Sequence, residues 1–218
     1  MGAASPFGHR WRGTSPGLFG SGPLAELAGN RHHDEHGHEP NRAKHKQHVR
    51  AVGEVARADA TMKAGKWIKK ELEGAELHAK TLGVIGFGRI GAAVGQRAAA
   101  FGMKIIGYDP LIPADEIQRR GGKPVTMDEL LAEADIITMH IPLTADSKNM
   151  LNADAFAKMK QGVYLVCAAR GGVIDEEALL AALESGKVAG AGLDVFATEP
   201  PGLTALVSHP RVVCTPHV

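Results

Sequence analysis

The sequence contains little cysteine, few aromatic residues and no long apolar run. Its two cysteines, Cys167 and Cys214, form no CxxC pair and no disulfide framework, which predicts a reducing, cytoplasmic compartment. No stretch approaches the roughly 18 consecutive apolar residues of a membrane span, so we expect no membrane partner. The charges nearly cancel, with 25 Lys and Arg against 24 Asp and Glu, so no bulk field attracts nucleic acid. These absences, with 44% hydrophobic and 22% charged residues, favour an ordinary soluble globular protein.

The first 50 residues lack the apolar periodicity of a folded domain. Residues 1–29 are rich in Gly and Pro, and residues 30–48 hold six of the eleven histidines and no aliphatic residue larger than Ala43. Imidazole is a common ligand of zinc, copper and nickel, so one interpretation is a metal-binding tract. The other is a solvated, disordered segment, because nothing apolar would hold such ligands in place. We expect the second, and therefore no metal site.

From residue 51 onward the apolar residues become regularly spaced. Val52, Val55, Ala58 and Met62 recur as on one face of a helix, and residues 65–80 form a polar linker. Beyond it, short apolar runs alternate with helical segments. This alternation predicts a parallel sheet covered on both faces, a doubly wound α/β domain of the Rossmann type. The expected strands are residues 81–86, 104–109, 134–141, 163–168, 190–196 and 211–217, and the expected helices are 88–101, 114–120, 127–133, 153–160 and 175–185.

A glycine motif follows the first expected strand. Gly86, Gly88 and Gly91 match GxGxxG, and the next expected strand ends at Asp109, eighteen residues after Gly91. The first glycine permits a tight turn, the second lets the backbone approach a pyrophosphate, and the third lets helix and strand pack closely. The helix N-terminus attracts the pyrophosphate, while the Asp109 carboxylate accepts ribose hydroxyls and repels a 2′-phosphate. The motif therefore predicts an NAD site, the alternative being a glycine turn with a surface aspartate.

Three charged side chains follow strands at the edge where open α/β sheets bind ligands. Arg170 follows residues 163–168 and suits bidentate binding of a carboxylate. Glu199 comes after residues 190–196, and His217 ends the last expected strand. A histidine that moves a proton, a glutamate that orients it and an arginine that binds an acid suit hydride transfer. Surface ion pairs of Arg170 and Glu199, and a solvated His217, are the alternatives that spacing alone leaves open.

Six segments carry a more specific likeness. In chain order they are KAGKW (63–67), GFGRIG (86–91), GYDP (107–110), ARGGVIDE (169–176), LDVFATEPP (193–201) and TPH (215–217). With these segments, residues 51–218 resemble the D-isomer-specific 2-hydroxyacid dehydrogenases, and most of all their D-3-phosphoglycerate dehydrogenase subfamily.

The resemblance implies an oxidoreductase that removes a hydride from C2 of a 2-hydroxy acid onto NAD. With 3-phosphoglycerate the product would be 3-phosphohydroxypyruvate, which feeds serine synthesis. In this family Arg170 would bind the substrate carboxylate and carbonyl, His217 would be the general acid/base on the hydroxyl, and Glu199 would be its partner. To the motif glycines Gly86, Gly88 and Gly91 as cofactor-binding residues, the resemblance adds Arg89 and Ile90 at the pyrophosphate, Asp109 at the ribose, Ile141, Ala168 and Ala169 along the cleft, and Asp194 near the nicotinamide amide.

Alternatives remain within this interpretation. A glycerate, lactate or glyoxylate type of dehydrogenase would use the same residues. An NAD(H)-responsive binding module, as in the related corepressors, would need the glycine loop and Asp109 but not His217. The resemblance also implies a homodimer through the cofactor domain, with the helix at 51–64 at the contact, although the same apolar stripe would equally suit packing on its own sheet.

The chain departs from the family at both ends. Residues 1–50 do not resemble the substrate-binding domain that family members carry ahead of the cofactor domain, and the sequence stops one residue after His217. We therefore divide it into a non-family segment (1–50), a helix and linker (51–80) and a truncated NAD-binding domain (81–218). We expect either a fragment or a misread frame over about the first 48 residues.

Overall fold

The computed structural model describes residues 54–72 and 76–218. The predictions for residues 1–50, namely a disordered or misread segment without a metal site, lie outside the described residues, as does Val52 of the helical stripe. No described helix is both long and apolar enough to cross a membrane.

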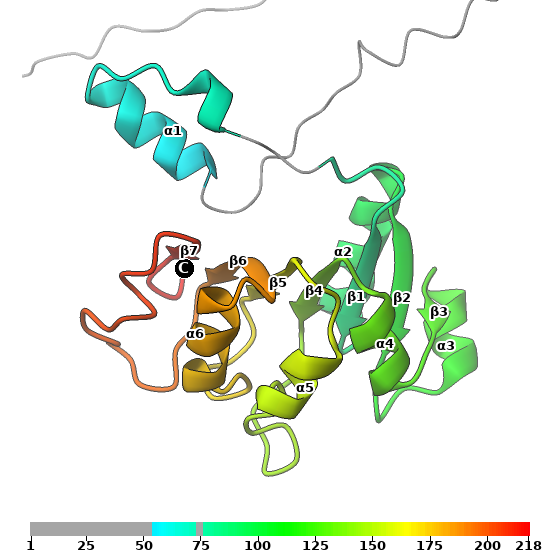
Figure 1. Cartoon of the computed structure of the whole chain (residues 1–218). Helices are drawn as coiled ribbons and strands as arrows, with labels where there is room; N and C mark the ends of the chain where they lie inside the picture. Colours follow the sequence, from blue (N-terminus) through cyan, green and yellow to red (C-terminus); the bar gives the residue numbers. More distant parts are fainter. Residues whose placement is uncertain (1–53, 73–75) are drawn as a thin grey trace, which may run out of the picture. The chain divides into compact units, whose positions relative to one another are not determined.

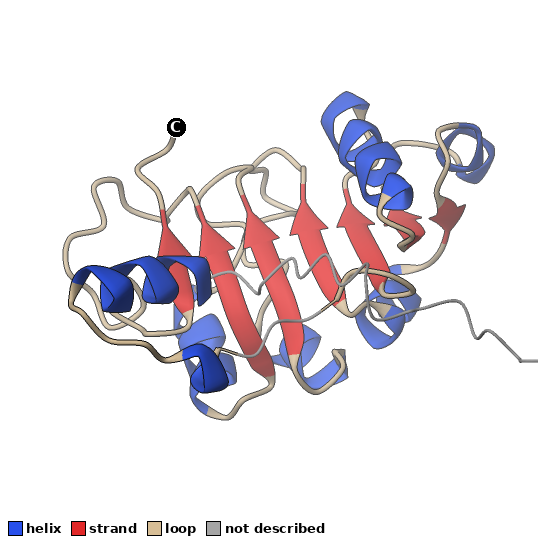
Figure 2. Ribbon diagram, turned by 90° about the horizontal axis from the view of Figure 1, so that it is seen from above, coloured by secondary structure: helices blue, strands red, loops and turns tan. Residues whose placement is uncertain are grey.

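A seven-stranded parallel sheet dominates the described residues, in the order β3-β2-β1-β4-β5-β6-β7. The strand order reverses between β1 and β4, which is the point of a doubly wound sheet where ligands bind. The strands end along one edge, beyond which the C-terminus lies (Figure 2). The predicted Rossmann-type sheet is thus confirmed. The strands are β1 (Thr81–Ile85), β2 (Lys104–Tyr108), β3 (Lys123–Pro124), β4 (Ile136–Met139), β5 (Val163–Cys167), β6 (Val188–Leu193) and β7 (Val212–Cys214).

Helices cover both faces of this sheet. Val84 faces α2. At the preceding position, Gly83, an added Cβ would lie 2.8 Å from Leu130 of α4 on the opposite face. Helices α4, α5 and α6 lie side by side on that opposite face (Figure 1). The helices are α1 (Glu54–Lys63), α2 (Arg89–Ala100), α3 (Ala114–Arg119), α4 (Met127–Glu133), α5 (Ala153–Lys158) and α6 (Glu176–Glu184), with a 3-10 helix, η2, at Lys69–Glu71.

The core follows from the apolar strands and divides between the two faces. On the face of α4 to α6, Ile137, Met139 and Leu165 of the strands are fully buried with side chains from the covering helices. On the face of α2, Phe87 is buried in a smaller cluster with Leu82, Val84, Met103, Ile105 and Ile117. The second cluster therefore lies directly behind the glycine motif.

Helix α2 differs from α4, α5 and α6 in how it begins. Thr126 begins α4 with a capping box that it forms with Glu129, Asn152 caps α5, and Asp175 caps α6. Helix α2 instead starts after Gly88, which offers no side-chain cap. Because the first N–H groups of a helix have no partner within it, those of α2 are left for a ligand.

Some predicted boundaries were wrong. The run 211–217 forms β7 only as far as Cys214, since Pro216 lacks a backbone donor and the chain after Cys214 turns toward the end of β6. The runs 134–141 and 190–196 form the strands Ile136–Met139 and Val188–Leu193. The edge strand β3 was not predicted, because two residues are too short to show a period. The predicted polar linker also contains the 3-10 helix η2.

Candidate active site

The three motif glycines meet different surroundings. Gly86 has φ +92°, which favours glycine, and a Cβ there would lie 2.6 Å from the carbonyl oxygen of His140. A Cβ on Gly91 would lie 2.0 Å from the carbonyl oxygen of Gly86, so helix α2 packs closely on the turn. A Cβ on Gly88 would meet nothing within 4 Å. The protein itself therefore requires Gly86 and Gly91, whereas Gly88 faces open space.

The start of α2 provides backbone donors next to that space. Its first intrahelical hydrogen bond runs from the N–H of Ala92 to the carbonyl oxygen of Gly88, at 3.0 Å. Arg89 and Ile90 are exposed. An uncapped helix N-terminus beside an open glycine matches the shape and charge of a pyrophosphate. These residues fit the phosphate part of a dinucleotide.

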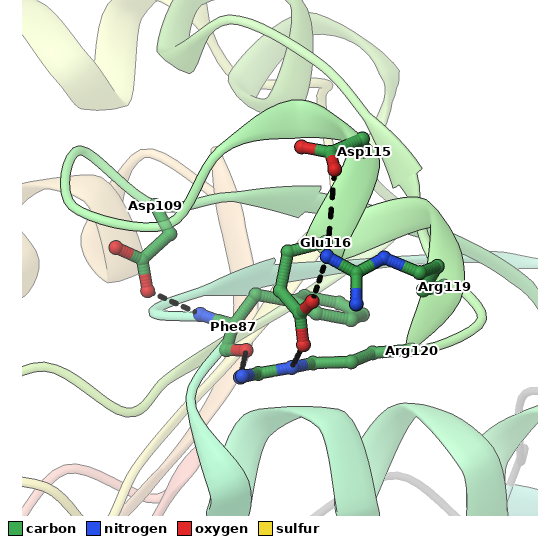
Figure 3. Close-up of polar contacts among 6 residues, drawn as sticks. All are labelled: Phe87, Asp109, Asp115, Glu116, Arg119 and Arg120. Atoms are coloured by element: carbon green, nitrogen blue, oxygen red, sulfur yellow. Dashed lines mark hydrogen bonds and ion pairs between the residues drawn. The ribbon is translucent and has the colours of Figure 1, made fainter.

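Asp109 lies beside the same loop (Figure 3). Its Oδ2 accepts the N–H of Phe87 at 2.8 Å, and its Oδ1 accepts those of Leu111 and Ile112 at 2.9 and 3.1 Å. A carboxylate has about four acceptor positions, so these three bonds leave one for a ribose hydroxyl. The carboxylate is thus held in place by the loops on either side of it and fits the ribose of a dinucleotide.

The loops after β5 and β6 are in direct backbone contact. A Cβ on Gly171 would lie 1.7 Å from the carbonyl oxygen of Phe196, a spacing that only glycine allows. The N–H of Asp194 also donates to the carbonyl oxygen of Cys167, at 2.9 Å. This contact places the loop that carries Arg170 against the loop that carries Asp194 and Glu199.

His217 pairs with Glu199 after the last strand. Nδ1 of His217 lies 2.9 Å from Oε2 of Glu199, whose Oε1 accepts the N–H of Phe196 at 3.0 Å. The hydrogen bond from His217 lowers the pKa of the Glu199 carboxyl, and the N–H of Phe196 lowers it further. An ionised Glu199 holds Nδ1 of the imidazole, and Nε2 lies outside this pair.

Asp194 holds the segment that carries His217. Its Oδ1 accepts the Thr215 hydroxyl and, at 3.1 Å, the N–H of Val218. The Thr215 hydroxyl lowers the pKa of Asp194, with the N–H of Val218 as the next cause. His217 has φ +57°, a left-handed conformation that costs free energy in a non-glycine residue. These two bonds to Asp194 hold the backbone on both sides of His217.

The structure gathers some of the predicted residues and separates others. Asp194, Glu199 and His217 line a cavity of about 410 Å³ together with Phe196 and Cys214. Arg170 is not among its lining residues; its guanidinium donates to the carbonyl oxygen of Ala169 at 2.6 Å. Among the remaining predicted contacts, Ile141 is buried with its Cγ2 near Gly86, Ala168 is exposed and Ala169 is half-buried.

The sequence reasoning missed four residues around these sites. Thr215 was seen only as part of the TPH segment, and Phe87 only as the spacer of the glycine motif. Arg120 donates to the carbonyl oxygen of Phe87 at 2.8 Å, from 33 residues away (Figure 3). His140 follows β4 with Nε2 3.1 Å from the Thr138 hydroxyl, and burial lowers its pKa. Of these four residues, only His140 could have been recognised from the sequence, as a polar residue at the end of an apolar run.

No group of three or more His, Cys, Asp or Glu side chains in residues 54–72 and 76–218 is arranged to hold a metal ion. The two cysteines are both free thiols, and burial raises the pKa of each.

Comparison with known proteins identifies the family. A family model described as the NAD binding domain of D-isomer specific 2-hydroxyacid dehydrogenases matches residues 47–218. D-3-phosphoglycerate dehydrogenase of Bacillus subtilis is 48% identical over 164 residues, which are 75% of this chain and 31% of that protein. Hydroxypyruvate reductase of Thermotoga maritima is 51% identical over 167 residues, which are 75% of this chain and 54% of that protein.

Solved structures agree with this assignment. A glyoxylate reductase from Paecilomyes thermophila has a TM-score of 0.71 and 41% identity, over 76% of this chain and 50% of that one. D-lactate dehydrogenase from Aquifex aeolicus, in a complex with NAD and lactic acid, has a TM-score of 0.68 and 36% identity. The match covers 76% of this chain and 55% of that one. The chain thus spans between about a third and about half of these relatives. The prediction of NAD as the cofactor is confirmed by the matching family. The chain belongs to the D-isomer specific 2-hydroxyacid dehydrogenase family, of which it carries the NAD-binding domain.

Proposed function

We propose that this chain binds NAD(H) across the start of α2 and oxidises or reduces at C2 of a 2-hydroxy acid. The observation that carries the proposal is the placement of two sets of groups along one sheet edge. The open Gly88, the uncapped α2 and Asp109 follow β1 and β2, and the His217–Glu199 pair follows β7 and β6. Bound NAD would supply the hydride acceptor.

The chain's own residues would divide the remaining work. His217, held at Nδ1 by Glu199, takes the proton of the substrate hydroxyl at Nε2 during oxidation and returns it during reduction. Asp194 keeps the His217 segment in place through Thr215 and the N–H of Val218. Arg170 binds the substrate carboxylate once its guanidinium turns from the carbonyl oxygen of Ala169.

D-3-phosphoglycerate is the substrate we propose first, with the reaction placed in serine biosynthesis in a reducing, cytoplasmic compartment. The six segments that carry the family resemblance are most similar to those of the phosphoglycerate subfamily, and a D-3-phosphoglycerate dehydrogenase is 48% identical over 164 residues. The 51% identity of a hydroxypyruvate reductase supports the smaller 2-hydroxy acids as the alternative. Initial rates with 3-phosphoglycerate, glycerate, lactate and glycolate as substrates of NAD reduction separate these cases.

The test of cofactor binding is a calorimetric titration of the purified full chain with NADH, with NADPH and an Asp109→Ala variant beside it. We expect saturable NADH binding that is weaker for NADPH and lost in Asp109→Ala, because the variant removes the ribose acceptor and releases the N–H of Phe87. NADPH binding as tight as NADH binding would contradict the role of Asp109.

A second candidate function is an NAD(H)-responsive binding module. It is favoured by the separation of the two sets of groups, since the glycine loop and Asp109 belong to β1 and β2, far in the strand order from β7. His217→Ala distinguishes the two functions. An enzyme loses its turnover of 2-hydroxy acids in this variant while NADH still binds, whereas a binding module keeps its biological role.

We also propose a homodimer in which α1 and the residues after it contact a second copy of the chain. Val55, Met62 and Trp67 are 64%, 54% and 76% exposed. Met62 and Trp67 line a hollow of about 460 Å³ with Ala58, Ile68 and Leu72. Exposed aromatic and methionine side chains that gather in this way are typical of protein interfaces.

A further inference from the structure

The glycine loop is held from the side opposite its open face, first by an aromatic ring. Phe87, between the first two motif glycines, has no exposed surface. A Cβ on Gly107 of β2, or on Gly122 just before β3, would lie 2.4 Å from its ring. The ring therefore lies against bare backbone on two sides. This contact fixes the position of the loop but not the orientation of its peptide planes.

Both backbone polar groups of Phe87 are bound by side chains from one region, the end of β2 and the end of α3 (Figure 3). The Phe87 N–H donates to Oδ2 of Asp109 at 2.8 Å. Its carbonyl oxygen accepts Nη1 of Arg120 at 2.8 Å. Nε of Arg120 donates in turn to Oε1 of Glu116 at 2.6 Å. The guanidinium thus bridges a carboxylate of α3 and the glycine loop.

This bridge determines where the loop's donors point. The carbonyl of Phe87 and the N–H of Gly88 belong to the same planar trans peptide and point in opposite directions. Because Arg120 holds the carbonyl toward α3, the N–H of Gly88 points away from α3. The position beside Gly88 is open, and the uncapped α2 begins there.

We propose that Arg120 is a positioning residue for the dinucleotide: it orients the Phe87–Gly88 peptide toward the pyrophosphate, and Glu116 holds its guanidinium in place. The inference rests on the proposed binding of NAD(H). Arg120 is 31% exposed and Glu116 is 22% exposed, so solvent screens this pair less than a fully exposed one. A planar guanidinium can bond two acceptors at once, which a lysine ammonium at the end of a flexible stem does less well.

Arg119 provides a matched control from the same helix turn. It precedes Arg120 directly, is 68% exposed and pairs with Asp115 at 3.4 Å and with Glu116. Replacing either arginine removes the same charge from the same part of the surface. Only Arg120 bonds the loop.

The first measurement is the NADH dissociation constant of the full chain, compared with those of Arg120→Met, Arg120→Lys and Arg119→Met. Loss of a charge-assisted hydrogen bond that orients the loop is expected to weaken NADH binding by about tenfold in Arg120→Met and about threefold in Arg120→Lys. Arg119→Met is expected to stay within about twofold, as for an exposed ion pair. Equal effects in Arg120→Met and Arg119→Met would overturn the proposal.

The second measurement separates positioning from general loosening of the fold. Saturation-transfer NMR compares ADP-ribose, which carries the pyrophosphate, with adenosine, which lacks it. Arg120→Met is expected to lose affinity for ADP-ribose by about the same factor as for NADH, while adenosine binding stays within about twofold. An equal loss for both ligands would overturn the proposal.

Three further outcomes are also decisive. If Arg120→Met does not fold, Arg120→Lys decides, and wild-type NADH affinity in that variant would overturn the role of the guanidinium. A wild-type chain that fails to bind NADH refutes the proposed function and this inference together. A wild-type chain that binds NADH no better than Arg120→Met refutes the inference alone.

Discussion

At the scale of single residues, glycine serves different purposes at the three glycine positions of the GxGxxG motif. Gly86 and Gly91 are glycines because the protein's own backbone lies where a Cβ would be, against His140 and Gly86 respectively. Gly88 has an ordinary φ of −67° and open space beside it. Substitution at these positions therefore separates the requirements of folding from those of the ligand.

Gly88→Ala is predicted to keep the fold and lose the cofactor. The new methyl group meets no protein atom, so the loss in unfolding free energy stays within about 1 kcal/mol, the cost of alanine at a helix N-cap. The methyl group occupies the space proposed for the pyrophosphate, so NADH affinity falls by about tenfold or more. Urea denaturation and NADH titration measure the two effects.

Gly91→Ala serves as its counterpart. Its Cβ would lie 2.0 Å from a backbone oxygen, so the helix has to move and stability falls by about 2 kcal/mol or more. Comparable stability losses in the two variants would contradict the distinction between these glycines.

Gly171→Ala is predicted to displace the loop that carries Arg170. A Cβ placed 1.7 Å from the carbonyl oxygen of Phe196 forces two backbones apart, at a cost of about 2–3 kcal/mol in unfolding free energy. Denaturant unfolding measures this cost, with Gly88→Ala as the control at an open position. A Gly171→Ala chain as stable as that control would show that the two loops are not in contact.

At the scale of secondary-structure elements, helices α4, α5 and α6 begin where the sequence offers side-chain caps. Thr126 accepts the N–H of Glu129 at 3.3 Å, and the Glu129 carboxylate accepts the N–H of Thr126 at 2.7 Å. The second bond and the Thr126 hydroxyl lower the pKa of Glu129. The residues of α4 pack against β1 on the face opposite α2, so this start supports the strand that leads into the glycine motif.

Thr126→Ala is predicted to lower the unfolding free energy by about 1 kcal/mol, the usual contribution of an N-cap hydroxyl. Thr126→Ser keeps that hydroxyl and should retain the wild-type value within a few tenths of a kcal/mol. Equilibrium denaturation of the three chains provides the measurement. If the serine and alanine variants lose equal stability, the capping box is not what stabilises α4.

At the scale of the whole molecule, acid is predicted to destabilise the fold in two steps. Burial lowers the pKa of His140, so the unfolded chain binds its proton first and stability declines as pH falls below about 6.5. Burial opposes ionisation of Asp135, but the Thr81 N–H and Lys160 outweigh it and lower the pKa. Lowered carboxylate pKa values stabilise the fold above the unfolded value of about 4, and this stability is lost as pH falls through the folded value.

Unfolding free energies measured from pH 8 to pH 3 test this order. His140→Asn is expected to remove the step that begins near pH 6.5, and Asp135→Asn to weaken the decline below about pH 4. Stability that rises on acidification from pH 6.5 to 5 would contradict the role given to His140.

Self-association is also a property of the whole molecule. Sedimentation velocity at micromolar concentration is expected to show a dimer in the wild-type chain. A chain with Met62→Glu and Trp67→Glu is expected to sediment as a monomer, because each change places a charge in the proposed apolar contact. Lys70→Glu, on the same segment but outside the hollow, is the control and should leave the dimer intact. A monomeric wild-type chain would refute the proposed interface.

Local patterns in the sequence determined much of this protein. Near-continuous apolar runs such as residues 163–168 predicted buried parallel strands, and the position of GxGxxG between a strand and a helix predicted the cofactor loop. Both predictions depend on residues that are close in the sequence, because the period of the side chains and the conformational freedom of the backbone are local properties. The segments that resemble the dehydrogenases likewise predicted the family that the comparison then showed.

Tertiary structure alone decided which distant groups meet. Arg120 reaches Phe87 across 33 positions from the end of α3. Asp194 holds the segment after β7 from 24 positions away, because parallel strands place their carboxyl ends along one edge. The same packing leaves Arg170 bonded to its own neighbour and outside the cavity of His217 and Glu199. Such contacts depend on strand order, on helix packing and on where a missing Cβ lets two backbones touch. The period and composition of a segment determine what it becomes, but not what comes to lie beside it.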